Sequence, residues 1–109
     1  MQKFIIKRGD TSPALRFALL PESVSLVGAV VRFQMRLRGG ATVIDRTAEI
    51  QSMFQPAVVA HAWDPGETDI AGRCEAEFRV TYADGTIETF PNHGFIDVFI
   101  IGDVPRLSD

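Results

Sequence analysis

The side chains that could act as nucleophiles are few in this sequence. Its one cysteine, Cys74, shares a face of a strand-like stretch with Ala76 and Phe78. A thiol among apolar side chains behaves as a small hydrophobe with a raised pKa, and it is a poor nucleophile. There is also no Gly-x-Ser-x-Gly elbow. We therefore predict no catalytic residues and a protein that is not an enzyme.

Metal ligands are equally scattered. The two histidines, His61 and His93, are too few for a typical zinc site, and nothing in their spacing brings them together. One loop gathers the carboxyls of Asp64, Glu67 and Asp69, which are oxygen ligands of the kind that calcium binds. Their spacing matches no calcium loop, and acidic residues are common in turns and caps. We predict no metal site and no cofactor.

Two motifs could recognise other macromolecules. Arg8-Gly9-Asp10 is the tripeptide that integrins read, but it directly follows an apolar strand-like stretch, where Gly-Asp favours a turn. The row Arg32, Arg36 and Arg38 could follow a phosphate backbone. Acidic residues on neighbouring strands should pair with it, however, and no aromatic residues are interleaved. With a net charge of -3, the chain is predicted not to bind nucleic acid.

Exposed aromatic side chains would be the mark of a sugar-binding module. Trp63 and Phe54 are the candidates, in a chain with a single Trp and a single Tyr. A core or loop-closing role for Trp63 is the favoured interpretation. A carbohydrate- or surface-binding β-sandwich stays open as the alternative function.

The elements that would hold these residues are strands. From Val30 to Arg38, apolar and polar residues alternate strictly, which is typical of a half-buried strand. Gly39-Gly40 can both take positive φ, as a tight hairpin turn requires, and a return strand is predicted from about Thr42 to Ile50.

The register of this hairpin can be predicted as well. It places Met35 opposite Ile44, but it also places Phe33 opposite Arg46. Either a bulge shifts the register there, or Arg46 lies over the edge of the sheet.

A second hairpin follows the same logic. The strand from Cys74 to Tyr82 turns at Asp84-Gly85 and returns over Thr86 to Phe90. A two-residue loop would put Tyr82 opposite Ile87. Because Phe90 then has the wrong parity, a bulge is expected near Thr89.

Weaker patterns complete the chain. Further strands are predicted at Lys3–Lys7, Leu15–Leu20, Val58–Trp63 and Phe95–Ile101, and short helical turns at Pro21–Leu26 and Asp64–Ala71. About seven or eight strands predict an all-β fold, an immunoglobulin-like antiparallel β-sandwich over residues 1–102, followed by a short polar tail at 103–109. A small barrel is the alternative.

Bulk composition agrees with one folded domain. The chain has 109 residues, 46% of them hydrophobic, which is enough for a core. No apolar run approaches the roughly 20 residues that cross a bilayer, and the apolar stretch at the N-terminus is too short for a signal peptide. We expect synthesis in the cytoplasm and no membrane partner.

Four stretches, taken in order and spacing, resemble the N-terminal immunoglobulin-like domain of phage baseplate upper proteins and related small tail proteins of phages and prophages. The stretches are Gly9–Phe17, Val30–Met35, Trp63–Gly72, and Tyr82–Thr86 with Phe90-Pro91. The resemblance covers about Lys3 to Ile101. It implies a non-enzymatic structural or adaptor component of the virion tail, made in the bacterial host. Its partners would be other tail or baseplate proteins, or further copies in a homo-oligomer, and the edge of the first strand is a place for strand addition.

Overall fold

A computed structural model describes residues 2–102, so the predicted polar tail at 103–109 lies outside the described residues. The described chain forms nine strands and no helix. They are β1 (Lys3–Lys7), β2 (Leu15–Leu19), β3 (Val30–Leu37), β4 (Thr42–Thr47), β5 (Glu49–Ser52), β6 (Ala57–His61), β7 (Gly72–Thr81), β8 (Ile87–Phe90) and β9 (Ile96–Ile101).

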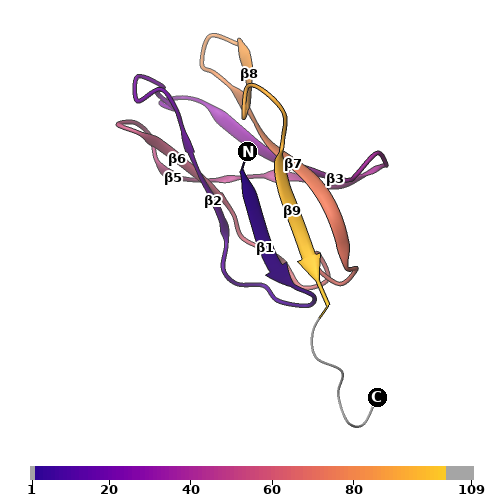
Figure 1. Cartoon of the computed structure of the whole chain (residues 1–109). Coiled ribbons are helices and arrows are strands. Elements are labelled where there is room, and N and C mark those ends of the chain that lie inside the picture. Colours follow the sequence, from indigo (N-terminus) through magenta and orange to yellow (C-terminus); the bar gives the residue numbers. More distant parts are fainter. Residues whose placement is uncertain (1, 103–109) are drawn as a thin grey trace.

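The strands form two sheets that pack face to face (Figure 1). The larger sheet has the order β1-β9-β7-β3-β4, with β8 also paired to β7, and the smaller has the order β2-β6-β5. This confirms the all-β immunoglobulin-like sandwich. One detail differs from the prediction, because β1 runs parallel to β9. These two strands come from opposite ends of the chain, so no hairpin constrains their relative direction.

Strands β8 and β9 share one place in the sheet. Both pair with the edge of β7 that lies opposite β3, through Phe78↔Phe90 and Ala76↔Ile96. Residues 91–95 loop out between them, while on β7 a single residue, Glu77, separates the two pairings. The nine segments therefore fill eight strand positions, within the predicted range.

The core lies between the two sheets and follows the alternation read from the sequence. Phe33 and Phe78 are fully buried on the inner face of the larger sheet. Their ring centroids are 5.2 Å apart, and Phe17 of the smaller sheet stacks on Phe78 at 6.0 Å. Aromatic pairs at such distances add to the free energy of burial, so this contact joins the two layers.

The first hairpin confirms the predicted register. Met35 pairs with Ile44, and Phe33 pairs with Arg46. The register shift lies nearer the turn, between Met35 and Arg36, so no bulge occurs at Arg46. Because β4 is an edge strand, Arg46 lies at the edge of the sheet, which was the other alternative.

The turn and the return strand of this hairpin differ from prediction. Of the two turn glycines, Gly39 takes a positive φ, of 69°, and Gly40 does not. The N–H of Leu37 donates to the carbonyl of Ala41, so the loop that it closes is longer than the predicted two residues. The return strand also divides at Ala48. Its first part, β4, stays with β3, whereas β5 pairs with β6 in the other sheet. Apolar alternation reports which side chains are buried but not which strand is the neighbour.

The second hairpin has a three-residue loop. The N–H of Tyr82 donates to the carbonyl of Thr86 at 2.8 Å, and Gly85 takes a φ of 89°. Ile87 therefore pairs with Thr81, and Phe90 pairs with Phe78 without a bulge. The predicted two-residue loop and the bulge near Thr89 are both wrong, since one added loop residue restores the parity of Phe90.

The two segments predicted as short helical turns are hydrogen-bonded turns. Val24 donates its N–H to the carbonyl of Pro21, and Glu67 donates its N–H to that of Asp64. Neither continues into a helix.

Candidate functional site

The densest group of ionisable side chains joins the edge of the larger sheet to the end of the smaller one. Arg46 comes from edge strand β4, His61 is the last residue of β6, and Asp64 and Glu67 follow in the loop that leads to β7. We call these four residues the Arg46 cluster. Its members come from two sheets and one loop, so the cluster exists only in the folded chain.

Glu67 is at the centre of the cluster. Its Oε2 accepts from Arg46 Nε at 3.0 Å. Its Oε1 accepts from Arg46 Nη2 at 3.0 Å, from His61 Nε2 at 3.0 Å and from the backbone N–H of Asp64 at 2.8 Å. Arg46 also donates to the Ala62 carbonyl at 2.9 Å and lies 3.1 Å from the Asp64 carboxylate. The two parallel hydrogen bonds from Arg46 to the two oxygens of Glu67 form the fork-shaped geometry in which arginine and carboxylate pair most strongly.

His61 is held neutral inside this group. Its ring stacks on Phe33 with 4.1 Å between centroids and meets the edge of Trp63 at 4.7 Å. Burial lowers the pKa of His61, although the hydrogen bond and charge of Glu67 oppose that shift. An ionised carboxylate can only accept, so the network assigns the ring proton to Nε2, which donates to Glu67.

The carboxyl of Glu67 is kept ionised. Burial by itself would raise the pKa of Glu67, but hydrogen bonds from the Asp64 N–H, from Arg46 and from His61 outweigh burial and lower it. Both oxygens are occupied by these donors. A carboxylate so engaged has little capacity to accept a substrate proton, and the cluster contains no serine or cysteine nucleophile. Its role is to fasten the loop at 62–69 to the sheet edge.

The acidic loop considered for calcium is explained by the same contacts. Asp64 and Glu67 both face Arg46, and Asp69 is exposed. Across residues 2–102, no group of three or more His, Cys, Asp or Glu side chains is placed to hold a metal ion.

The other predicted residues lie apart from one another. Cys74 is 2% exposed on the inner face of β7, and burial raises the pKa of its thiol, as expected from its strand position. His93 is exposed in the loop between β8 and β9, so it does not meet His61 in the core. Arg8-Gly9-Asp10 forms the predicted turn, in which the Asp10 N–H donates to the Lys7 carbonyl at 3.0 Å.

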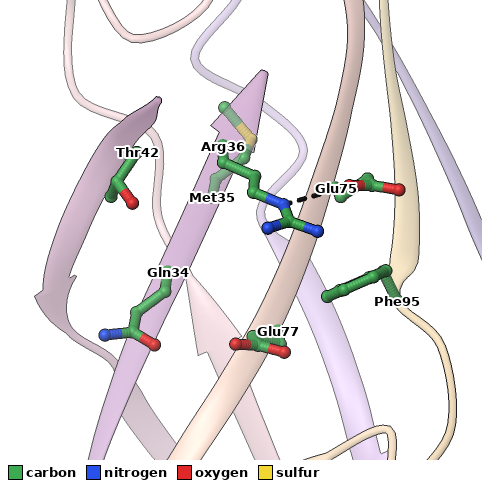
Figure 2. Close-up of a pocket in the computed structure, with 7 residues that line it drawn as sticks. All are labelled: Gln34, Met35, Arg36, Thr42, Glu75, Glu77 and Phe95. Carbon is green, nitrogen blue, oxygen red and sulfur yellow. Dashed lines mark hydrogen bonds and ion pairs between the residues drawn. The ribbon is translucent and has the colours of Figure 1, made fainter. Parts of the chain in front are cut away.

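Two of the three arginines of the row are paired across strands, as predicted. Arg32 meets Asp45 at 2.8 Å, and Arg36 meets Glu75 at 3.0 Å. Figure 2 shows the shallow hollow beside Arg36, where the guanidinium points toward Glu75 and lies 4.8 Å from the ring centre of Phe95. The hollow measures about 130 Å³. Pockets for small molecules usually exceed roughly 300 Å³, so this one is too small for most ligands.

Trp63 offers no face to a sugar. It is 4% exposed and packs against Phe4, Phe33 and His61. Phe54, in the loop between β5 and β6, is 54% exposed. One exposed aromatic ring is a small platform for carbohydrate stacking.

The sequence singles out each member of the Arg46 cluster separately, but nothing in it shows that the four side chains meet. The available signal was Arg46 itself, a charged residue with core parity between Ile44 and Ala48. The spacing of Asp64 and Glu67 was a second signal, because a glutamate three residues on can reach back to the N–H of the earlier residue.

Comparisons with protein-family models, with curated proteins and with solved structures found no match to this chain. No helix in the described part of the chain could cross a membrane.

Proposed function

We propose that this chain is a non-enzymatic structural or adaptor module that works through protein–protein contacts in a phage or prophage tail or baseplate. The assembly is suggested by the four stretches that resemble baseplate upper proteins and small tail proteins. A location in the virion tail, after synthesis in the host cytoplasm, follows from the same resemblance.

The observation that carries the proposal is the contrast between reactive side chains that are already engaged or buried and a sheet edge whose backbone is open. The reactive groups of the Arg46 cluster are engaged with one another, and the Cys74 thiol is buried. In the described part of the chain, strand β1 lies at the edge of the larger sheet and has a neighbouring strand on one side only. An open sheet edge is a surface that proteins use to bind other proteins.

The carbohydrate-binding alternative has lost its main support. It depended on an exposed Trp63, and the buried position of that ring leaves Phe54 as the remaining candidate. A glycan array should therefore give no signal above a control domain.

Co-expression with the proteins encoded beside this chain, followed by mass measurement of the intact complex, tests the proposal. We expect a complex of defined stoichiometry with a tail or baseplate protein. The proposal fails if the chain is recovered alone in every combination and does not co-sediment with tail particles.

A further inference from the structure

The backbone of β1 offers hydrogen-bonding groups on its outer edge. The carbonyl of Gln2 accepts from Asp97, and the N–H of Arg8 donates to Ile101, so even-numbered residues point their backbone groups toward β9. Directions alternate along a strand. The backbone N–H groups of Lys3, Ile5 and Lys7 therefore point away from the sheet (Figure 1, where β1 lies beside β9).

The same three residues place their side chains on the outer face. All three are exposed, Ile5 to 55%, while Ile6 is buried on the inner face. Ile5 lies beside the half-buried Phe99, its register partner on β9. An added strand would thus find an apolar centre next to Ile5, between two positively charged positions.

No ion pair among residues 2–102 balances the positive charge of the two lysines at this edge. Lys3 and Lys7 are the only lysines of the whole sequence. Asp97 is the register partner of Lys3, but it is paired with Arg73 at 3.0 Å. Lys3 lies over the ring of Phe99, 5.3 Å from its centre, and neither lysine forms an ion pair within residues 2–102.

We propose that β1 accepts an extended segment of a partner protein as an added strand, with acidic residues opposite Lys3 and Lys7 and an apolar residue opposite Ile5. Backbone hydrogen bonds to the odd-numbered residues supply affinity, and the alternating side chains supply specificity. The inference rests on the proposed function only in requiring a protein partner.

A second copy of this chain is the competing occupant, and charge disfavours it. Pairing two β1 strands antiparallel about Ile5 places Lys3 opposite Lys7 of the other copy, and in-register parallel pairing places each lysine opposite itself. Like charges directly opposite one another destabilise a sheet. A partner with acidic residues at these positions turns the same repulsion into attraction.

The first test uses the whole chain and a blocked peptide, Thr-Glu-Val-Ile-Val-Glu-Thr, with Thr-Lys-Val-Ile-Val-Lys-Thr as its matched control. Amide hydrogen exchange is measured by NMR with and without peptide. We expect the glutamate peptide to slow exchange at Lys3, Ile5 and Lys7 by about tenfold, and to leave Phe4 and Ile6, already bonded to β9, unchanged. No protection at these amides, or equal protection by both peptides, overturns the proposal.

The second test reverses the charge of the edge. The double variant Lys3→Glu/Lys7→Glu should bind the glutamate peptide about tenfold more weakly and bind the lysine peptide instead, with both effects shrinking at high salt. The control Arg38→Glu/Arg79→Glu changes the net charge equally at exposed positions away from β1 and should bind as the natural chain does. If both double variants bind the glutamate peptide equally weakly, the net charge of the chain explains the loss of affinity, and the edge site is refuted.

The third test removes a backbone donor. Proline is tolerated on an edge strand at a position whose N–H points to solvent, as that of Ile5 does. Ile5→Pro should therefore keep the pairing with β9 and abolish peptide binding. Ile5→Val is the control that keeps the N–H. Circular dichroism and the Tm show whether each variant is folded, and unchanged peptide binding by a folded Ile5→Pro overturns the proposal.

Two outcomes separate this inference from the proposed function. If the chain binds a tail protein and Ile5→Pro binds it equally well, the function stands and the edge site is wrong. If the chain forms a dimer that Ile5→Pro dissolves, the occupant is a second copy and the acidic partner is wrong.

Discussion

Substituting Glu67 tests whether the Arg46 cluster holds the loop against the sheet. In Glu67→Gln the shape is nearly kept, but the charge is lost and one oxygen that accepts from Arg46 is replaced by an amide nitrogen. Breaking a fully buried ion pair by removing one partner costs about 3–5 kcal/mol. Because the Arg46 side chain is 39% exposed, water can solvate it again, and we expect a loss of about 2 kcal/mol in the free energy of unfolding.

The single tryptophan makes the measurement direct. Trp63 packs against His61, so its fluorescence reports on the cluster during urea or thermal unfolding. A loss of about 2 kcal/mol corresponds to a fall in Tm of roughly 10 °C for a domain of this size. The matched control is Glu22→Gln at an exposed loop position, which should stay within about 0.5 kcal/mol of the natural chain.

Changes at the two ends of this ion pair should not have additive effects on stability. Arg46→Met destabilises by itself, but it should add little in a chain that already carries Glu67→Gln, because the two residues act through one contact. A change of less than about 0.5 kcal/mol in Glu67→Gln, or simple additivity with Arg46→Met, would refute the anchoring role.

Three further predictions follow from the described contacts. Burial lowers the pKa of His61 in the folded chain below its usual 6.5, so below pH 6.5 the unfolded chain binds more protons than the folded chain. The contribution of His61 to stability should therefore be full above about pH 6.5 and should fall as the pH drops toward the folded pKa. Urea titrations at several pH values should show a weaker dependence of stability on pH in His61→Gln. The buried thiol of Cys74 should react with a disulfide reagent only after denaturant is added, and a fast reaction in the native state would contradict its position. Burial and the adjacent Glu88 carboxylate raise the pKa of Tyr82 to about 12, so ultraviolet titration of this single tyrosine should show a midpoint near that value and a lower one in Glu88→Gln.

Strict alternation made most of the fold predictable. The pattern from Val30 to Arg38 and that from Cys74 to Tyr82 become β3 and β7, the central pair of the larger sheet. The apolar faces are buried as predicted, except that Leu37, at the end of β3, is 43% exposed. The weaker strands were also found to within about one or two residues. Loop lengths were harder. A two-residue turn and a three-residue turn have the same glycine signals in the sequence. One extra loop residue changes which side chains of the return strand are paired with the inward-facing residues of the first strand.

The site shows the same division. The sequence by itself determined that Cys74 is buried in the core, that the arginine row is exposed, and that Arg8-Gly9-Asp10 is a turn, because each of these depends on neighbours along the chain. Only the tertiary structure decided that Arg46 meets Glu67 and His61, that the return strand changes sheets at Ala48, and that β1 ends the sheet. Those outcomes depend on contacts between residues far apart in the chain, and the local pattern of side chains does not show which distant residues will meet.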